Sequence, residues 1–124
     1  MLAACGGAPL QTIKVVNLTD RQIEAIYVFP TGAKDRGPSR GGLAPQQSTQ
    51  VRMKAGAVDV EAISSKIKFD EHHRDQPTAS QSLELTHPIE IDFYDSTAKP
   101  AGLDRPDVIG TPFTINTPPP ASEQ

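Results

Sequence analysis

Apolar and polar residues alternate at a period of two over most of this 124-residue chain. In one run, Val51 and Met53 alternate with Arg52 and Lys54. Because successive side chains of a strand point to opposite faces, this period favours half-buried β-strands over helices. The pattern, with some irregularity, covers residues 13–16, 23–29, 49–54, 58–69, 83–85, 89–94 and 108–115.

Seven short runs separated by turn signals predict an all-β fold, a small antiparallel β-sandwich of about seven strands with long loops. The run 23–29 is apolar on both faces, which predicts a central strand. Gly110 and Pro112 interrupt the last run and predict an edge or irregular strand. We expect a tether over residues 1–11, the β domain over 12–117 and an extended Pro-rich tail over 118–124.

The residues Leu2-Ala3-Ala4-Cys5 resemble a bacterial lipobox. The resemblance implies that Cys5 is the lipid attachment site, that a signal peptide precedes it and that the lipid anchors the protein to a membrane. Gly6 rather than Asp after the cysteine is similar to lipoproteins sent to the outer membrane, on its periplasmic or cell-surface face. The alternative is an alanine-rich N-terminus with a free thiol.

A second resemblance rests on three short segments. The turn Val16-Asn17-Leu18-Thr19, the run Ile26–Gly32 and the turn Leu43–Ser48 are similar to the first half of a group of exported bacterial β-sandwich domains. The resemblance implies an exported, non-catalytic domain and supplies no catalytic residues. Asn17-Leu18-Thr19 also matches a glycosylation sequon, but we interpret it as a turn between two strands.

Composition limits the function classes. The net charge of −3 provides no basic surplus, so no nucleic-acid partner is expected. No apolar stretch approaches the length of about 18 residues that suggests a membrane-spanning helix. Cys5 is the sole cysteine, which excludes an internal disulfide, and its covalent lipid is the only attached group that we expect.

Catalytic and metal motifs are weak in this sequence. No serine lies in a Gly-x-Ser-x-Gly elbow, so we predict that the protein is not an enzyme. The cluster Asp70–Asp75 contains His72 and His73, but adjacent residues rarely share one zinc ion, and we favour a charged hairpin loop. Asp92 and Asp95 are candidate calcium ligands, although the usual calcium loop signature is missing.

The most promising binding residues are basic. Lys34, Arg36 and Arg40 lie in a glycine-rich loop, and Arg52 follows on a polar strand face. Loops on a rigid β scaffold often carry binding function, so we predict that these four residues contact a partner.

These observations together predict a lipid-anchored envelope protein. We expect a non-catalytic accessory or scaffold subunit that binds other envelope proteins, within a multi-subunit complex. The alternative is a ligand-binding module for calcium, through Asp92 and Asp95, or for an anionic glycan, through the basic loop.

Overall fold

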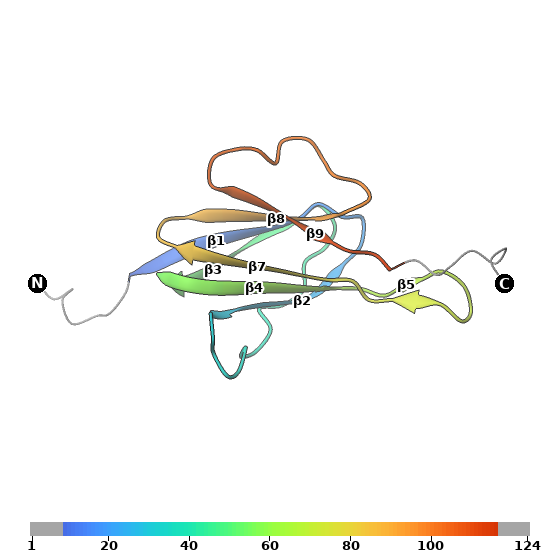
Figure 1. Ribbon diagram of the computed structural model, residues 1–124, viewed down its shortest axis with the longest axis horizontal. Coiled ribbons are helices and arrows are strands. Elements are labelled where there is room, and N and C mark those ends of the chain that lie inside the picture. Colours follow the sequence, from blue (N-terminus) through green and yellow to red (C-terminus); the bar gives the residue numbers. More distant parts are fainter. Residues whose placement is uncertain (1–8, 117–124) are drawn as a thin grey trace, which may run out of the picture.

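The computed structural model describes residues 9–116, which form nine β-strands and no helix (Figure 1). The strands are β1 (Leu10–Asn17), β2 (Ile23–Pro30), β3 (Ser48–Lys54), β4 (Gly56–Ser64), β5 (Ile67–Lys68), β6 (Arg74–Asp75), β7 (Thr78–Leu85), β8 (Ile89–Asp95) and β9 (Val108–Phe113). The prediction of an all-β chain is therefore confirmed for this part of the protein. Strand β1 begins two residues before the domain boundary expected at residue 12.

The strands form sheets of four, three and two strands. The order is β3-β1-β8-β9 in the first sheet and β2-β4-β7 in the second, and β5 pairs with β6. Each of the seven predicted runs overlaps a strand, although β7 begins at Thr78, five residues before the predicted run 83–85. The fourth run breaks at Ser64-Ser65 as expected, and the residues beyond the break begin the short hairpin β5–β6.

The prediction of a wholly antiparallel fold is wrong for two strand pairs. Strands β1 and β8 are parallel, and so are β8 and β9, whereas the other four pairs are antiparallel. Parallel neighbours need a crossover connection of about a dozen residues or more. The twelve residues between Asp95 and Val108 supply that connection for β8 and β9.

Alternate side chains of both larger sheets point into one apolar core. Ile13 and Val15 of β1 belong to the same buried cluster as Val60 of β4, and the tilted rings of Phe93 and Phe113 pack with 5.6 Å between their centres. The two sheets thus bury their inner faces against a shared core, which is a sandwich-like arrangement. The alternating burial along β1 and β4 agrees with the period of two in the sequence.

Strand β2 is an edge strand, which contradicts the prediction of a central one. A bulge between Ile23 and Ala25 changes its register, so Ile23, Ile26 and Val28 all point inward. Its outer edge is covered by the β2–β3 loop: Leu43 and Ile23 exchange two backbone hydrogen bonds, of 2.8 and 2.9 Å. The covering loop satisfies backbone groups that a neighbouring strand would otherwise pair.

The predicted turn at Asn17 is confirmed, and Asn17 itself is fully buried. Its side-chain amide donates to the carbonyls of Arg21 and Leu43, at 2.7 and 3.0 Å, and its Oδ1 accepts two hydrogen bonds from Thr19. The Asn-x-Thr triplet therefore has a structural role at the end of β1.

The molecule has two ends along its long axis (Figure 1). We call the end where β1 begins the near end, and the end where the hairpin β5–β6 lies the far end. At the near end, Leu10 pairs with Lys54 and Gly56 pairs with Leu85. At the far end lie the Asn17 turn, the hairpin β5–β6 and the end of β9. Three residues beyond β9, the Asn116 N–H donates to Asp75 Oδ2. No helix in residues 9–116 has the length and apolar character to cross a membrane.

The lipobox and the Pro-rich tail lie outside the described residues.

Strand β9 is the outer strand of its sheet, as Gly110 and Pro112 predicted. The β8–β9 loop, residues 96–107, lies on one side of the two larger sheets, and the β2–β3 loop, residues 31–47, lies on the other (Figure 1).

Candidate functional site

The most developed polar site lies on the outer face of the four-stranded sheet. Alternation along β8 sends Ile91 and Phe93 into the core and Glu90 and Asp92 outward. Between these outward residues and the β8–β9 loop is a polar hollow of about 510 Å³. Its polar side chains are those of Lys14, Gln46, Ser48, Glu90, Asp92 and Arg105.

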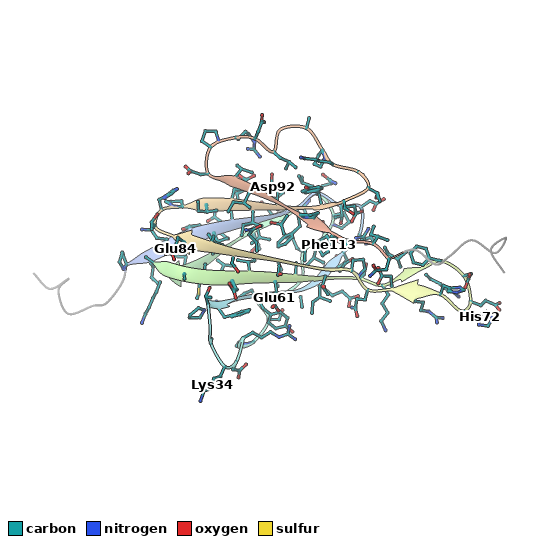
Figure 2. The ribbon with its side chains drawn as sticks, viewed as in Figure 1. Lys34, Glu61, His72, Glu84, Asp92 and Phe113 are labelled. Carbon is teal, nitrogen blue, oxygen red and sulfur yellow. The ribbon has the colours of Figure 1, made fainter. Side chains whose placement is uncertain are left out.

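Arg105 of the β8–β9 loop spans the two carboxylates of the hollow. Its Nη2 lies 3.0 Å from Glu90 Oε2 and 3.2 Å from Asp92 Oδ2, and Lys14 Nζ lies 4.0 Å from Glu90 Oε1. The Asp92 side chain is only 2 % exposed, and Figure 2 places it between β8 and the loop. Its Oδ1 is a buried polar atom that no hydrogen bond from the described residues satisfies.

Burial changes how this carboxylate pair titrates. Loss of solvation, followed by the hydrogen bond to Glu90, raises the pKa of Asp92 to about 6. The hydrogen bond from Asp92 lowers the pKa of Glu90, and Arg105 lowers it further. Below about pH 6 the pair therefore holds its proton on Asp92 rather than on Glu90, because burial disfavours a charged Asp92 and Arg105 stabilises a charged Glu90.

Sequence reasoning selected Asp92 but missed its actual neighbours. Glu90 and Asp92 are two apart on a strand, a spacing that places both carboxylates on one face and was the available signal. Arg105 and Lys14 were not predictable in this way, because they reach the hollow from a crossover loop and from another strand.

Asp95 does not join Asp92 in a common site. Both of its carboxylate oxygens accept hydrogen bonds from Arg21, at 2.7 and 2.8 Å, in a bidentate ion pair. Arg21 also donates to Ser64 Oγ at 2.9 Å and lies 5.9 Å from the centre of the Phe113 ring. The pair of residues suggested for calcium is therefore divided between two environments, and Asp95 is already bound to a cation.

The four basic residues predicted to contact a partner do not form one patch. Arg36 stacks 3.9 Å above the Tyr27 ring and pairs with Glu61 at 3.0 Å, on the outer face of the three-stranded sheet. Arg40 reaches the Val28 carbonyl and Met53 Sδ, both at 3.5 Å.

The other two basic residues lie elsewhere. Arg52 projects from β3 on the outer side of the four-stranded sheet, since its neighbour Val51 is in the core. Lys34 lies at the tip of the β2–β3 loop, on the opposite side of the molecule from Asp92 (Figure 2).

The histidine cluster is a hairpin loop, as predicted. The backbone N–H groups of His72 and His73 donate to Asp70 Oδ1, and His73 Nδ1 lies 2.8 Å from both Asp70 oxygens. No group of three or more His, Cys, Asp or Glu side chains within residues 9–116 has the arrangement of a metal site.

Cys5, the expected lipid attachment residue, lies outside the described residues. No known protein family, curated protein or solved structure matches this chain. The interpretation of its function therefore depends on the chemistry and geometry of its own residues.

Proposed function

We propose that this protein is a lipid-anchored accessory subunit of the bacterial envelope, with a non-catalytic β-sandwich domain that binds another envelope protein. Its lipid is attached to Cys5, within the lipobox-like segment Leu2–Cys5. The domain is exported and held at the outer membrane, on the periplasmic or cell-surface face.

The observation that carries the proposal is the position of the two ends of the domain. Strand β1 begins at the near end, five residues after Cys5, whereas the hairpin β5–β6 and the end of β9 lie at the far end (Figure 1). A domain attached at one end of its long axis directs the other end away from the membrane. This geometry suits a subunit that presents a surface to a partner.

The hairpin β5–β6 is the proposed partner contact. It extends beyond the two larger sheets, and Figure 2 shows His72 at its tip. Exposed charged residues flank the half-buried Phe69 in the sequence, and such a mixture of charged and aromatic residues is common in protein interfaces. The basic residues Lys34, Arg36, Arg40 and Arg52, predicted from the sequence to contact a partner, are distributed over other faces, so the hairpin takes their place as the proposed contact.

The intact mass of the protein purified from its native membrane tests the anchor. We expect a chain that lacks residues 1–4 and carries acyl groups on Cys5, and we expect Cys5→Ser to remove both changes. An unmodified chain that begins at Met1 would contradict the proposed anchor.

A photo-crosslinking amino acid at position 72 tests the partner contact in intact cells. When the crosslinker replaces His72, we expect a discrete adduct of higher mass. When it replaces Gln50, an equally exposed residue on β3, we expect no adduct. Equal labelling from both positions would contradict a contact confined to the far end.

The polar hollow favours a second candidate, a module for an anionic glycan. Lys14 and Arg105 contribute two positive charges there, and the proton held by Asp92 removes part of the opposing negative charge. Calorimetry with sulfated and neutral oligosaccharides at pH 5.5 distinguishes the two functions. A glycan-binding module should release heat with the sulfated oligosaccharide, whereas an accessory subunit that binds no glycan should release none. Calcium in the same instrument tests the Asp92 and Asp95 hypothesis.

A further inference from the structure

An apolar hollow of about 430 Å³ opens at the near end of the domain. Both larger sheets contribute to its lining, which consists of Leu10, Pro30, Arg52, Met53, Lys54, Ala55, Ala57 and Val58. Leu10 is 50 % exposed and is the exposed large hydrophobic residue of the part of the chain that the structure describes. Together with the apolar lining, Leu10 forms a contiguous exposed apolar surface, which is the kind of surface that binds a partner or a membrane.

The charged residues that line the hollow have one sign. Arg52 and Lys54 are both exposed cations of β3, and the other lining residues are all apolar. Leu10 lies directly opposite Lys54 in the β1–β3 ladder, so the exposed apolar side chain and a cation are neighbours. An apolar group beside cations is the chemistry that binds the headgroup region of an anionic bilayer.

We infer that this near-end hollow, with Leu10, Arg52 and Lys54, docks the domain on the surface of an anionic phospholipid membrane. The inference rests on the proposed lipid anchor at Cys5, because the anchor determines which end meets the bilayer. Leu10 enters the headgroup region, and Arg52 and Lys54 bind lipid phosphates while their alkyl stems cover the apolar lining.

The length of chain between Cys5 and Leu10 supports this choice of occupant. Whatever their conformation, five residues span at most about 18 Å. A lipid on Cys5 therefore keeps Leu10 close to the headgroups, and a surface so held at the bilayer is covered by lipid rather than by a distant protein. Docking limits the orientations of the domain and holds the far-end hairpin away from the membrane.

A single tryptophan tests which end meets the lipid. The chain contains no tryptophan, so Leu10→Trp and the matched control His72→Trp each provide one reporter, at the near and far ends respectively. Both lipidated full-length variants are reconstituted in vesicles of phosphatidylcholine with phosphatidylglycerol, with and without brominated acyl chains. We expect the vesicles to shift the fluorescence of the near-end tryptophan to the blue, and the brominated chains to quench it. The far-end tryptophan should show neither change. Equal quenching of both tryptophans, or quenching of neither, would overturn the inference.

The cations are tested in the chain without lipid. Each basic residue near an anionic surface adds about fivefold to partitioning, so Arg52→Gln with Lys54→Gln in the Cys5→Ser chain should weaken binding to phosphatidylglycerol vesicles about 30-fold. Lys66→Gln with Lys99→Gln, which removes two exposed cations elsewhere on the domain, is the matched control and should leave binding unchanged. Unchanged binding in the first pair would overturn the headgroup contact.

The two proposals fail in different ways. If mass spectrometry finds no lipid on Cys5, the anchor is wrong, and vesicle binding of the soluble chain still decides the docking surface. If lipid is present but the near-end tryptophan remains in water, the anchor stands and the docking surface is wrong. A blue shift of the near-end tryptophan without quenching by brominated lipid also overturns membrane docking, since it indicates a protein occupant.

Discussion

At the scale of single residues, the buried polar groups define this fold more sharply than the exposed charges do. Asn17 is fully buried with both its amide and its carbonyl oxygen hydrogen-bonded. Arg21 connects three parts of the chain at the far end, through Asp95, Ser64 and the Phe113 ring. Such groups are costly to leave unpaired, and they therefore specify one arrangement of turns.

The ion pairs of Arg21 and Arg36 should differ in their contribution to stability. Arg21→Ala leaves Asp95, which is 14 % exposed, without its bidentate partner and should cost about 3 kcal/mol. Arg36→Ala removes an exposed pair and an exposed stacking contact and should cost about 1 kcal/mol. Urea unfolding of both variants measures the difference, and equal losses would contradict the structural role given to Arg21.

Asp92 should make stability fall as pH rises. Its pKa is raised from 3.8 to about 6 in the folded protein, so folding favours the protonated form, and this contribution is lost as pH rises toward and through 6. The lowered pKa of Glu90 has the opposite effect, because it makes stability rise with pH. This effect is confined to pH values below about 4.5, the ordinary pKa of the group. Between pH 5 and 7 we expect a loss of about 1 kcal/mol from Asp92.

Asp92→Asn provides the comparison. Asparagine keeps a donor toward Glu90 and does not titrate, so the variant should lose less stability between pH 5 and 7 than the unmodified chain does. The difference between the two proteins isolates Asp92 from every ionisable group that they share. Identical pH profiles from thermal unfolding would contradict a protonated Asp92.

At the scale of elements, the loops complete the sheets. The β2–β3 loop covers the free edge of β2, and its close approach requires glycine, since a Cβ on Gly42 would lie 2.9 Å from the Ile23 carbonyl oxygen. The β8–β9 loop covers the outer face of the other sheet in a similar way. A Cβ on Gly110 would lie 3.0 Å from Leu103 Cδ1 and 3.2 Å from the Tyr94 ring.

Leu43 should be the main attachment point of the β2–β3 loop. Its side chain is 6 % exposed and belongs to the core cluster, so Leu43→Ala should cost about 2–3 kcal/mol. Leu10→Ala is the matched control: Leu10 is 50 % exposed and should cost less than about 1 kcal/mol. Hydrogen exchange should show faster exchange at the Ile23 and Leu43 amides in the first variant, and uniform acceleration everywhere would contradict a local attachment.

At the scale of the whole molecule, the two larger sheets share one core. Residues of β1, β8 and β9 belong to the same buried cluster as residues of β2, β4 and β7. Neither sheet has a separate core among the described residues, so neither should remain folded without the other.

The two tyrosines report on the two sheets separately. Tyr27 lies on β2 and Tyr94 on β8, and the chain has no tryptophan to obscure them. Tyr27→Phe and Tyr94→Phe each leave one tyrosine reporter, and the urea midpoints from both should coincide with the far-UV midpoint. A transition that occurs earlier in one sheet would contradict a single cooperative unit.

The alternation of residues was sufficient for the strands and most core positions. Ile13, Val60 and Phe93 occupy alternating apolar positions of their runs and are buried, because a strand reverses its side chains at every step. Strict alternation would place Ile23 and Ile26 on opposite faces of β2, but a bulge between Ile23 and Ala25 puts both side chains in the core. A bulge depends on contacts across strands, so local spacing does not reveal it.

The sequence by itself determined the class of fold, the strand segments and the charged hairpin at Asp70–Asp75. Tertiary structure decided the strand order, the parallel pairs β1–β8 and β8–β9, and the neighbours of each charged residue. It separated Asp92 from Asp95 and joined Asp92 to Glu90, Arg105 and Lys14. The physical reason is that burial within a strand follows from adjacent residues, whereas pairing and electrostatics join residues that are far apart in the chain.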